Sequence, residues 1–80
     1  MTEELRAAAQ DVDVTVWVGK AGIDAVVAEL EDQLADRDLV KVKFLRSARG
    51  GTTTDELADR LAERTGADVV ETRGNTAVYH

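Results

Sequence analysis

Gly19-Lys20-Ala21-Gly22 is the segment whose residue types and spacing best suit a chemical task, the binding of a phosphate group. Because neither glycine has a Cβ atom, the backbone of such a turn can approach a ligand closely. A helix that starts at Gly22 would add unpaired N–H donors and the positive end of its dipole, and Lys20 would add a charge. The tetrapeptide alone is a weak signal, since two glycines also serve simply to turn a chain.

An enzymatic interpretation would let this loop hold a nucleotide phosphate while an acid pair such as Asp36 and Asp38 binds a metal. The complete P-loop pattern is missing, because no Gly-Lys-Ser/Thr follows at the required spacing. The single histidine, His80, is the last residue, where fraying opposes acid–base catalysis. An acid pair of this kind is more often a solvated helix edge. We therefore expect no enzyme, no cofactor and no metal site.

Basic side chains gather in one stretch of an otherwise acidic chain. The sequence has 16 Asp and Glu against 10 Lys and Arg, a net charge of -6. Residues 39–54 contain Lys41, Lys43, Arg46 and Arg49 but no acid, so this window carries +4 and the other 64 residues carry -10. An evenly acidic protein would repel nucleic acid, whereas this separation of charge leaves one region that attracts it.

The acidic background has two explanations. One is a solvated surface that keeps the protein soluble. The other is a salt-rich cytoplasm, in which charge repulsion is screened within about 3 Å and excess carboxylates hold water at the surface. The low lysine content, three residues against seven arginines, together with few aromatics, favours the second explanation. We expect the source to be a salt-adapted archaeon.

The apolar periodicity predicts one α/β domain over residues 1–80 in the order α-β-α-β-α-β-β. Predicted helices span 2–10, 22–36 and 54–65, and predicted strands span 12–18, 39–45, 67–72 and 75–79. A mobile basic loop is expected over 46–52. The strands would form a four-stranded mixed sheet with the helices packed on it.

Several of these boundaries rest on local signals. Thr2 is placed to cap the first helix, and Thr53 followed by Glu56 has the spacing of a capping box for the third. Gly66 would end that third helix in a left-handed conformation. A tight turn at Arg73-Gly74 would join the last two strands as a hairpin.

The strand predicted at 39–45 places its valines and Phe44 on one face, beneath the helices, and Lys41 and Lys43 on the other. Trp17 would share the second face, and Tyr79 is a further candidate for it. A tryptophan among lysines suits base stacking, with the lysines neutralising phosphates. The alternative, which the sequence slightly favours, is that the first helix covers Trp17 as part of a small core. Lys41 and Lys43 would then only keep the strand face solvated.

Several motifs now combine into a recognisable set. They are Val-Trp-Val-Gly-Lys-Ala-Gly-Ile at 16–23, Asp-Leu-Val-Lys-Val-Lys at 38–43 and Thr-Gly-Ala-Asp-Val-Val at 65–70, followed by Gly74 and Val78-Tyr79. Over residues 12–79 this set resembles the CRM domain, the YhbY-like family of RNA-binding proteins. The resemblance implies a fold similar to the C-terminal domain of translation initiation factor three, with a loop similar to that of the KH domain.

Bacterial members of this family are associated with the precursor of the large ribosomal subunit, and plant members assist intron splicing. By position, the resemblance assigns RNA contacts to the glycine loop and the basic strand; stacking and electrostatics add an aromatic residue and three arginines. The complete candidate set is Trp17, Gly19, Lys20, Ala21, Gly22, Lys41, Lys43, Arg46, Arg49 and Arg73. The family typically has a longer, basic first helix, whereas Glu3 and Glu4 make this one acidic. Since His80 closely follows the last predicted strand, we also expect no contribution from the basic tail that some relatives have.

The expected function is binding of structured, ribosomal-precursor RNA through the Gly-x-x-Gly loop and the basic strand during assembly of the large subunit. In high salt, ordinary phosphate attraction is weakened, since log K changes by about -0.7 per neutralised phosphate for each tenfold rise in salt. Backbone N–H bonds, stacking on Trp17 and a preformed RNA shape would then carry affinity.

The alternative function is a protein-interaction module that docks on basic ribosomal proteins through an acidic helix face around Glu29 and Asp32. In either case we expect a monomer, because no apolar seam is evident. The chain has no cysteine and no apolar stretch of signal or membrane-spanning length, so a cytoplasmic location is expected, with no membrane partner.

Overall fold

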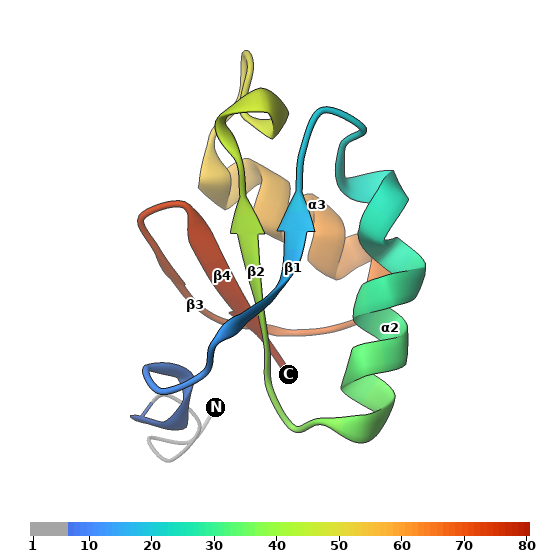
Figure 1. Cartoon of the computed structure of the whole chain (residues 1–80), viewed down its shortest axis with the longest axis vertical. Helices are drawn as coiled ribbons and strands as arrows, with labels where there is room; N and C mark the ends of the chain where they lie inside the picture. Colours follow the sequence, from blue (N-terminus) through green and yellow to red (C-terminus); the bar gives the residue numbers. More distant parts are fainter. Residues whose placement is uncertain (1–6) are drawn as a thin grey trace.

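The computed structural model describes residues 7–80 and contains a four-stranded mixed sheet (Figure 1). Its strands are β1 (Val14–Val18), β2 (Val40–Phe44), β3 (Val69–Arg73) and β4 (Thr76–Tyr79), in the order β1-β2-β4-β3. β1 is parallel to β2, whereas β2 and β3 each pair antiparallel with β4. The predicted α/β class and mixed sheet are confirmed, with each strand slightly shorter than its predicted range.

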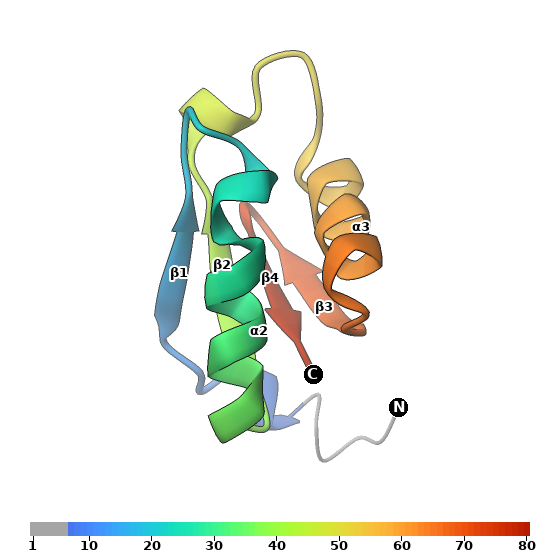
Figure 2. The same ribbon diagram turned by 90° about the vertical axis from the view of Figure 1, so that its right-hand side faces the viewer.

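One face of the sheet carries the hydrophobic core beneath α2 (Val27–Asp36) and α3 (Thr54–Thr65). Figure 2 shows both helices on the same side of the sheet. Val40, Val42 and Phe44 of β2 are fully buried in this core. Lys41 and Lys43 alternate with them and are half-buried on the opposite face. This confirms the predicted alternation, because successive side chains of a strand point to opposite faces.

Tyr79 lies in the same core, so its expected place on the second face is wrong. It pairs with Val40 across β2 and β4, and paired residues share a face. Its side chain is fully buried, and its hydroxyl donates a hydrogen bond of 2.8 Å to the carbonyl oxygen of Ala58 in α3. Burial raises the pKa of this hydroxyl, with a further contribution from the Asp59 carboxylate. The sequence predicted the strand but not its register, and the register decides the face.

β1 departs from strict alternation near its start. A register shift between Val14 and Val16 puts Val16 and Val18 in the core, whereas Val14 pairs with Lys41 and is only half-buried. Thr15 is turned toward α2, where its hydroxyl donates a hydrogen bond of 2.5 Å to Oε1 of Gln33. The bulge therefore leaves Val14 outside the core, although the alternation predicts it there, and the bond from Thr15 joins the edge strand to α2.

The predicted helix over 22–36 begins with a 3₁₀ turn, η1 (Ile23–Val26), and continues as α2. Gly22 precedes it with φ 83° and ψ -178°, an extended conformation of the kind that only glycine adopts readily. Four residues thus separate the glycine loop from the first residue of the α-helix. The expectation that an α-helix starts at Gly22 is wrong, and the dipole of α2 acts at a greater distance from the loop than predicted.

α3 begins and ends where the sequence predicts, because both of its ends are determined locally. The Thr53 hydroxyl accepts a 3.2 Å hydrogen bond from the Glu56 N–H. The Glu56 carboxylate accepts a 2.7 Å bond from the Thr52 hydroxyl, so only half of the predicted capping box forms. Gly66 ends the helix with φ 75°, in the predicted left-handed conformation.

β3 and β4 form the predicted hairpin, with the turn one residue later than expected. Arg73 pairs with Thr76 as the last rung, and the turn residues are Gly74 and Asn75. Gly74 has a positive φ of 58°, which the first position of such a turn requires. Arg73 therefore belongs to the strand and takes its side-chain direction from the sheet.

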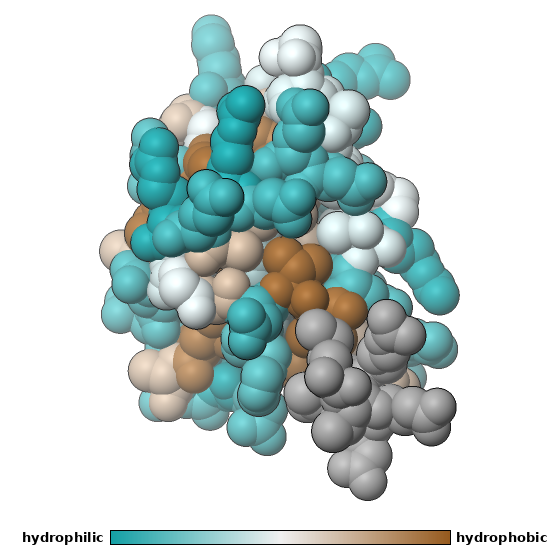
Figure 3. Space-filling model, turned by 180° about the vertical axis from the view of Figure 1, so that it is seen from behind, coloured by the Kyte–Doolittle hydropathy of each residue, from teal (hydrophilic) through white to brown (hydrophobic). Residues whose placement is uncertain are grey.

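A second, smaller cluster lies on the other face of the sheet, where Ala9, Val70 and Val78 are buried and Leu39 packs against them. Residues 7–9 are helical, in agreement with the end of the predicted first helix; Thr2, Glu3 and Glu4 lie outside the described residues. Seen from behind Figure 1, the surface is mostly hydrophilic, with hydrophobic residues exposed near its centre and in smaller groups toward its left side (Figure 3). No helix within residues 7–80 combines the length and apolar character needed to cross a membrane.

Candidate nucleic-acid interface

Three loops lie at one end of the sheet: two at the top of Figure 1 and, lower and at the left, the turn between β3 and β4. The parallel strands β1 and β2 both end there, and the antiparallel β4 begins there. The Leu45 N–H donates a 2.8 Å bond to the Val18 carbonyl, and the Phe44 N–H donates a 2.7 Å bond to the Asn75 carbonyl. These bonds hold the basic loop (46–52) between the glycine loop (19–22) and the hairpin turn (74–75). We call this the loop end.

The glycine loop is a closed turn, in which the Gly22 N–H donates a 3.0 Å bond to the Gly19 carbonyl. Lys20 and Ala21 occupy its exposed centre. A Cβ atom built on Gly19 would lie 3.7 Å from Oγ of Ser47, whereas one on Gly22 would meet no atom within 4 Å. Gly19 thus faces the neighbouring loop, and Gly22 faces open space.

Backbone donors remain available at this turn. Within the described residues, no hydrogen-bond acceptor is found for the N–H groups of Lys20, Ala21, Ile23 and Asp24. The Gly22 N–H is not among them, because it closes the turn. The loop therefore offers N–H donors beside one lysine, which is the arrangement that suits an anion, although the α-helix starts too late to reinforce it strongly.

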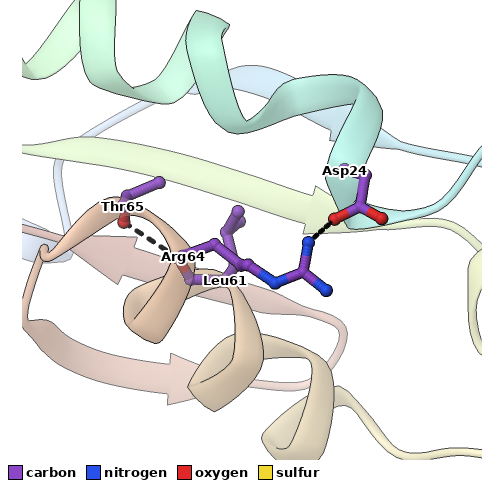
Figure 4. A network of polar contacts seen from close by, with 4 residues as sticks. All are labelled: Asp24, Leu61, Arg64 and Thr65. Atoms are coloured by element: carbon purple, nitrogen blue, oxygen red, sulfur yellow. Dashed lines mark hydrogen bonds and ion pairs between the residues drawn. The ribbon is translucent and has the colours of Figure 1, made fainter.

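Asp24 places a carboxylate next to the loop, and Arg64 of α3 pairs with it across 40 residues of sequence (Figure 4). Both side chains are exposed, so the pair contributes little stability. Its consequence for the site is electrostatic, because Arg64 offsets the acid that lies nearest to Lys20 along the chain. Sequence reasoning missed Arg64, and no local pattern links it to Asp24.

A row of four residues crosses the second face of the sheet just below the loop end. The strand pairings place Trp17 next to Lys43, Lys43 next to Thr76, and Thr76 next to Arg73. Adjacent strands lie about 4.8 Å apart, so this cross-strand row is roughly 14 Å long. Trp17 is 54% exposed, which overturns the slightly favoured expectation that the first helix covers it. An aromatic ring and two cations therefore share one open surface.

Lys41 lies on the same face, one row further from the loop end. Its neighbours across the strands are Val14 and Val78, and the row ends at Glu71. Lys41 thus lies between apolar residues, close to the cluster that includes Ala9. The structure keeps the two lysines on one face, as predicted, but gives them different surroundings.

The arginines differ in their availability. Arg46 is exposed in η2 (Arg46–Ala48), a 3₁₀ turn within the segment that was expected to be a mobile loop. Arg49 is half-buried, and its Nε donates a 3.1 Å bond to the Phe44 carbonyl. Arg49 therefore fastens the basic loop to the end of β2, whereas Arg46 and Arg73 extend into solvent.

The cations and N–H donors of this set of groups suit a polyanion. Residues 7–80 contain no group of three His, Cys, Asp or Glu side chains arranged to hold a metal ion. His80 follows β4 at the end of the sheet opposite the loop end, where its N–H pairs with the Asp68 carbonyl. Asp36 and Asp38 are the acid pair considered for a metal. Asp36 is the last residue of α2, Asp38 lies two residues beyond it, and both are exposed.

The sequence and the fold can now be compared with known proteins. Residues 1–80 match the CRS1 / YhbY (CRM) domain. The chain belongs to this family. The resemblance read from the sequence motifs is confirmed.

Two relatives extend this identification. A Methanocaldococcus jannaschii protein named "Probable RNA-binding protein" is 39% identical over 75 residues, which is 94% of this chain but 56% of that protein. The CRM domain described here thus spans little more than half the length of that curated relative. A Staphylococcus aureus protein, described as a candidate RNA-binding protein in its solution structure, matches with a TM-score of 0.79 and 29% identity. That match covers 98% of this chain and 80% of the other.

Proposed function

We propose that this CRM domain binds structured RNA through its loop end and the adjacent cross-strand row. The observation that carries the proposal is that one end of the sheet carries exposed cations from three distant segments, represented by Lys20, Arg46 and Arg73, together with the exposed ring of Trp17. The names of the two relatives point to the same class of ligand. Cations neutralise phosphates, and the ring and free N–H groups add attraction that does not depend on released counterions.

The proposed ligand is RNA of the large ribosomal subunit precursor, and the proposed role is in assembly of that subunit. An acidic chain with a small basic end suits this role, because its -6 net charge disfavours indiscriminate binding to polyanions. A folded RNA that meets the loop end in one orientation keeps the acidic surfaces away from its backbone. The proposal includes adaptation of the chain to a salt-rich cytoplasm. A high salt concentration would weaken purely ionic contacts with RNA further.

The test is a titration of the protein with structured ribosomal RNA and with duplex DNA, read by fluorescence of Trp17, the only tryptophan. Lys20→Glu should weaken RNA binding at least about tenfold, since a charge-assisted contact contributes about 1.5 kcal/mol or more. Arg60→Glu is the matched control, because it makes the same charge change at an exposed position of α3. Equal losses in both variants, or equal binding of RNA and DNA, would contradict the proposal.

A second candidate function rests on α2. This helix exposes Glu29, Glu31, Asp32 and Asp36 and contains no basic residue, so it could dock on a basic ribosomal protein. The double substitution Glu29→Lys and Asp32→Lys should abolish such docking without weakening RNA binding. Pull-down by immobilised ribosomal proteins measures it, and unchanged capture of the variant would exclude α2 as the docking surface.

A further inference from the structure

The cross-strand row lies close to the loop end along each strand, and the two regions offer different kinds of contact. Trp17 lies two residues before Gly19, Lys43 lies three residues before Arg46, and Arg73 directly precedes the hairpin turn. The loops provide cations and N–H groups suited to a sugar–phosphate backbone. The row adds a ring face, which a backbone does not need.

An exposed tryptophan alone does not indicate a binding site, because single exposed apolar residues are common. Here the ring lies on the edge strand β1, has a lysine as its neighbour in register, and begins a row that ends in an arginine. No acid lies in this row, since Glu71 belongs to the next one. Within residues 7–80, neither Lys43 nor Arg73 forms an ion pair. The charges therefore complement a phosphodiester chain that crosses the strands from β1 toward β3.

A base inside a duplex cannot stack on Trp17, because both of its faces are covered by its neighbours, so the exposed ring favours an unpaired base. The roughly 14 Å of the row also exceeds what one nucleotide covers, so further phosphates would lie near Lys43 and Arg73. The loop end, by contrast, requires only a backbone of fixed shape. One RNA that satisfies both parts is a helical stem from which a single strand leaves.

We infer that the RNA recognised by this domain contains a junction between a stem and unpaired nucleotides, with the first unpaired base stacked on Trp17 and the following phosphates at Lys43 and Arg73. This inference rests on the proposed RNA-binding function and names its substrate class. The loop end holds the stem, and the cross-strand row selects stems that continue as a single strand.

The test compares one RNA hairpin with the same hairpin carrying a short single-stranded extension labelled with 2-aminopurine at its first base. Anisotropy of a dye on the stem measures affinity, and 2-aminopurine fluorescence reports stacking. The wild type should prefer the extended hairpin by between about 5-fold and 150-fold, the range expected for one stacked base. Trp17→Leu should remove this preference while changing affinity for the plain hairpin less than about twofold, and Trp17→Phe should retain most of it.

Arg73→Glu should weaken binding of the extended hairpin more than binding of the plain one, with Arg60→Glu as the charge-matched control. Thermal unfolding of each variant establishes that it is folded, which is expected because the altered side chains are exposed. Equal affinity of the wild type for both hairpins would overturn the inference and leave the proposed function intact. An equal loss for both hairpins in Trp17→Leu would also overturn it, whereas binding to neither hairpin would remove the proposed function as well.

Discussion

Gly22 is the residue on which the geometry of the glycine loop depends. With φ 83° and ψ -178° it lies in a region that costs other residues about 1–3 kcal/mol, although a side chain there would meet no neighbour. Gly19 has an ordinary φ, and its Cβ would make only normal contacts. Gly22→Ala should therefore destabilise the domain by about 1–3 kcal/mol and Gly19→Ala by less than about 0.5 kcal/mol. Urea denaturation measures both, and equal losses would show that the two glycines are structurally equivalent.

Tyr79 makes stability sensitive to alkaline pH. Its buried hydroxyl has a raised pKa, so the unfolded chain loses this proton first as the pH rises above about 10. Its stabilising effect is complete below that pH and is lost as the pH rises through the folded-state pKa. The free energy of unfolding should fall by up to about 1.4 kcal/mol per pH unit from this group.

Tyr79→Phe is the matched variant for that effect. It should lose about 1 kcal/mol at neutral pH, because the bond to the Ala58 carbonyl is missing, yet decline less steeply at alkaline pH. Chemical denaturation at several pH values compares the two slopes. Since the chain has one tyrosine, tyrosinate absorbance also reports its titration directly. Parallel slopes would mean that Tyr79 is not the responsible group.

At the scale of an element, α3 depends on its N-cap. Thr53→Ala removes the acceptor of the Glu56 N–H and should cost about 1 kcal/mol. Thr52→Ala is the control, because it removes only an exposed bond to the Glu56 side chain and should cost much less. Thermal unfolding monitored by circular dichroism distinguishes them. A larger loss in Thr52→Ala would place the effective cap one residue earlier.

α3 also shows what could be predicted from the sequence and why. Its two ends, Thr53 and Gly66, are marked by residues that act within one turn, and the alternation of β2 is equally local. The face of Tyr79, the bulge at Val14 and the pairing of Asp24 with Arg64 depend on contacts between distant segments. The same holds for the candidate site. Its residues could be predicted from sequence motifs. The exposure of Trp17 and the hydrogen bond from Arg49 to the end of β2 could not, because they depend on the strand register and on the conformation of the turns.

For the whole molecule, the uneven charge predicts opposite salt dependences of stability and of RNA affinity. Screening shortens from about 30 Å at 0.01 M salt to 3 Å at 1 M, which relieves repulsion among the excess carboxylates. KCl should therefore raise the free energy of unfolding. Affinity for single-stranded RNA should fall with a log–log slope near -2 if about three phosphates are neutralised. Denaturation and binding titrations in the same KCl series measure both, and a stability that falls with salt would assign the larger role to ion pairs.

The strand order β1-β2-β4-β3 brings Trp17, Lys43 and Arg73 together from segments that are far apart in sequence. The unfolded chain has no such surface. An RNA that binds this surface therefore binds only the folded protein and shifts the folding equilibrium toward the native state. At a free RNA concentration 100 times the Kd, the domain should gain about 2.7 kcal/mol of stability. A melting temperature that climbs with RNA concentration would thus act as a binding assay without any label, and peptide 39–54, despite its +4 charge, should bind far more weakly than the folded protein.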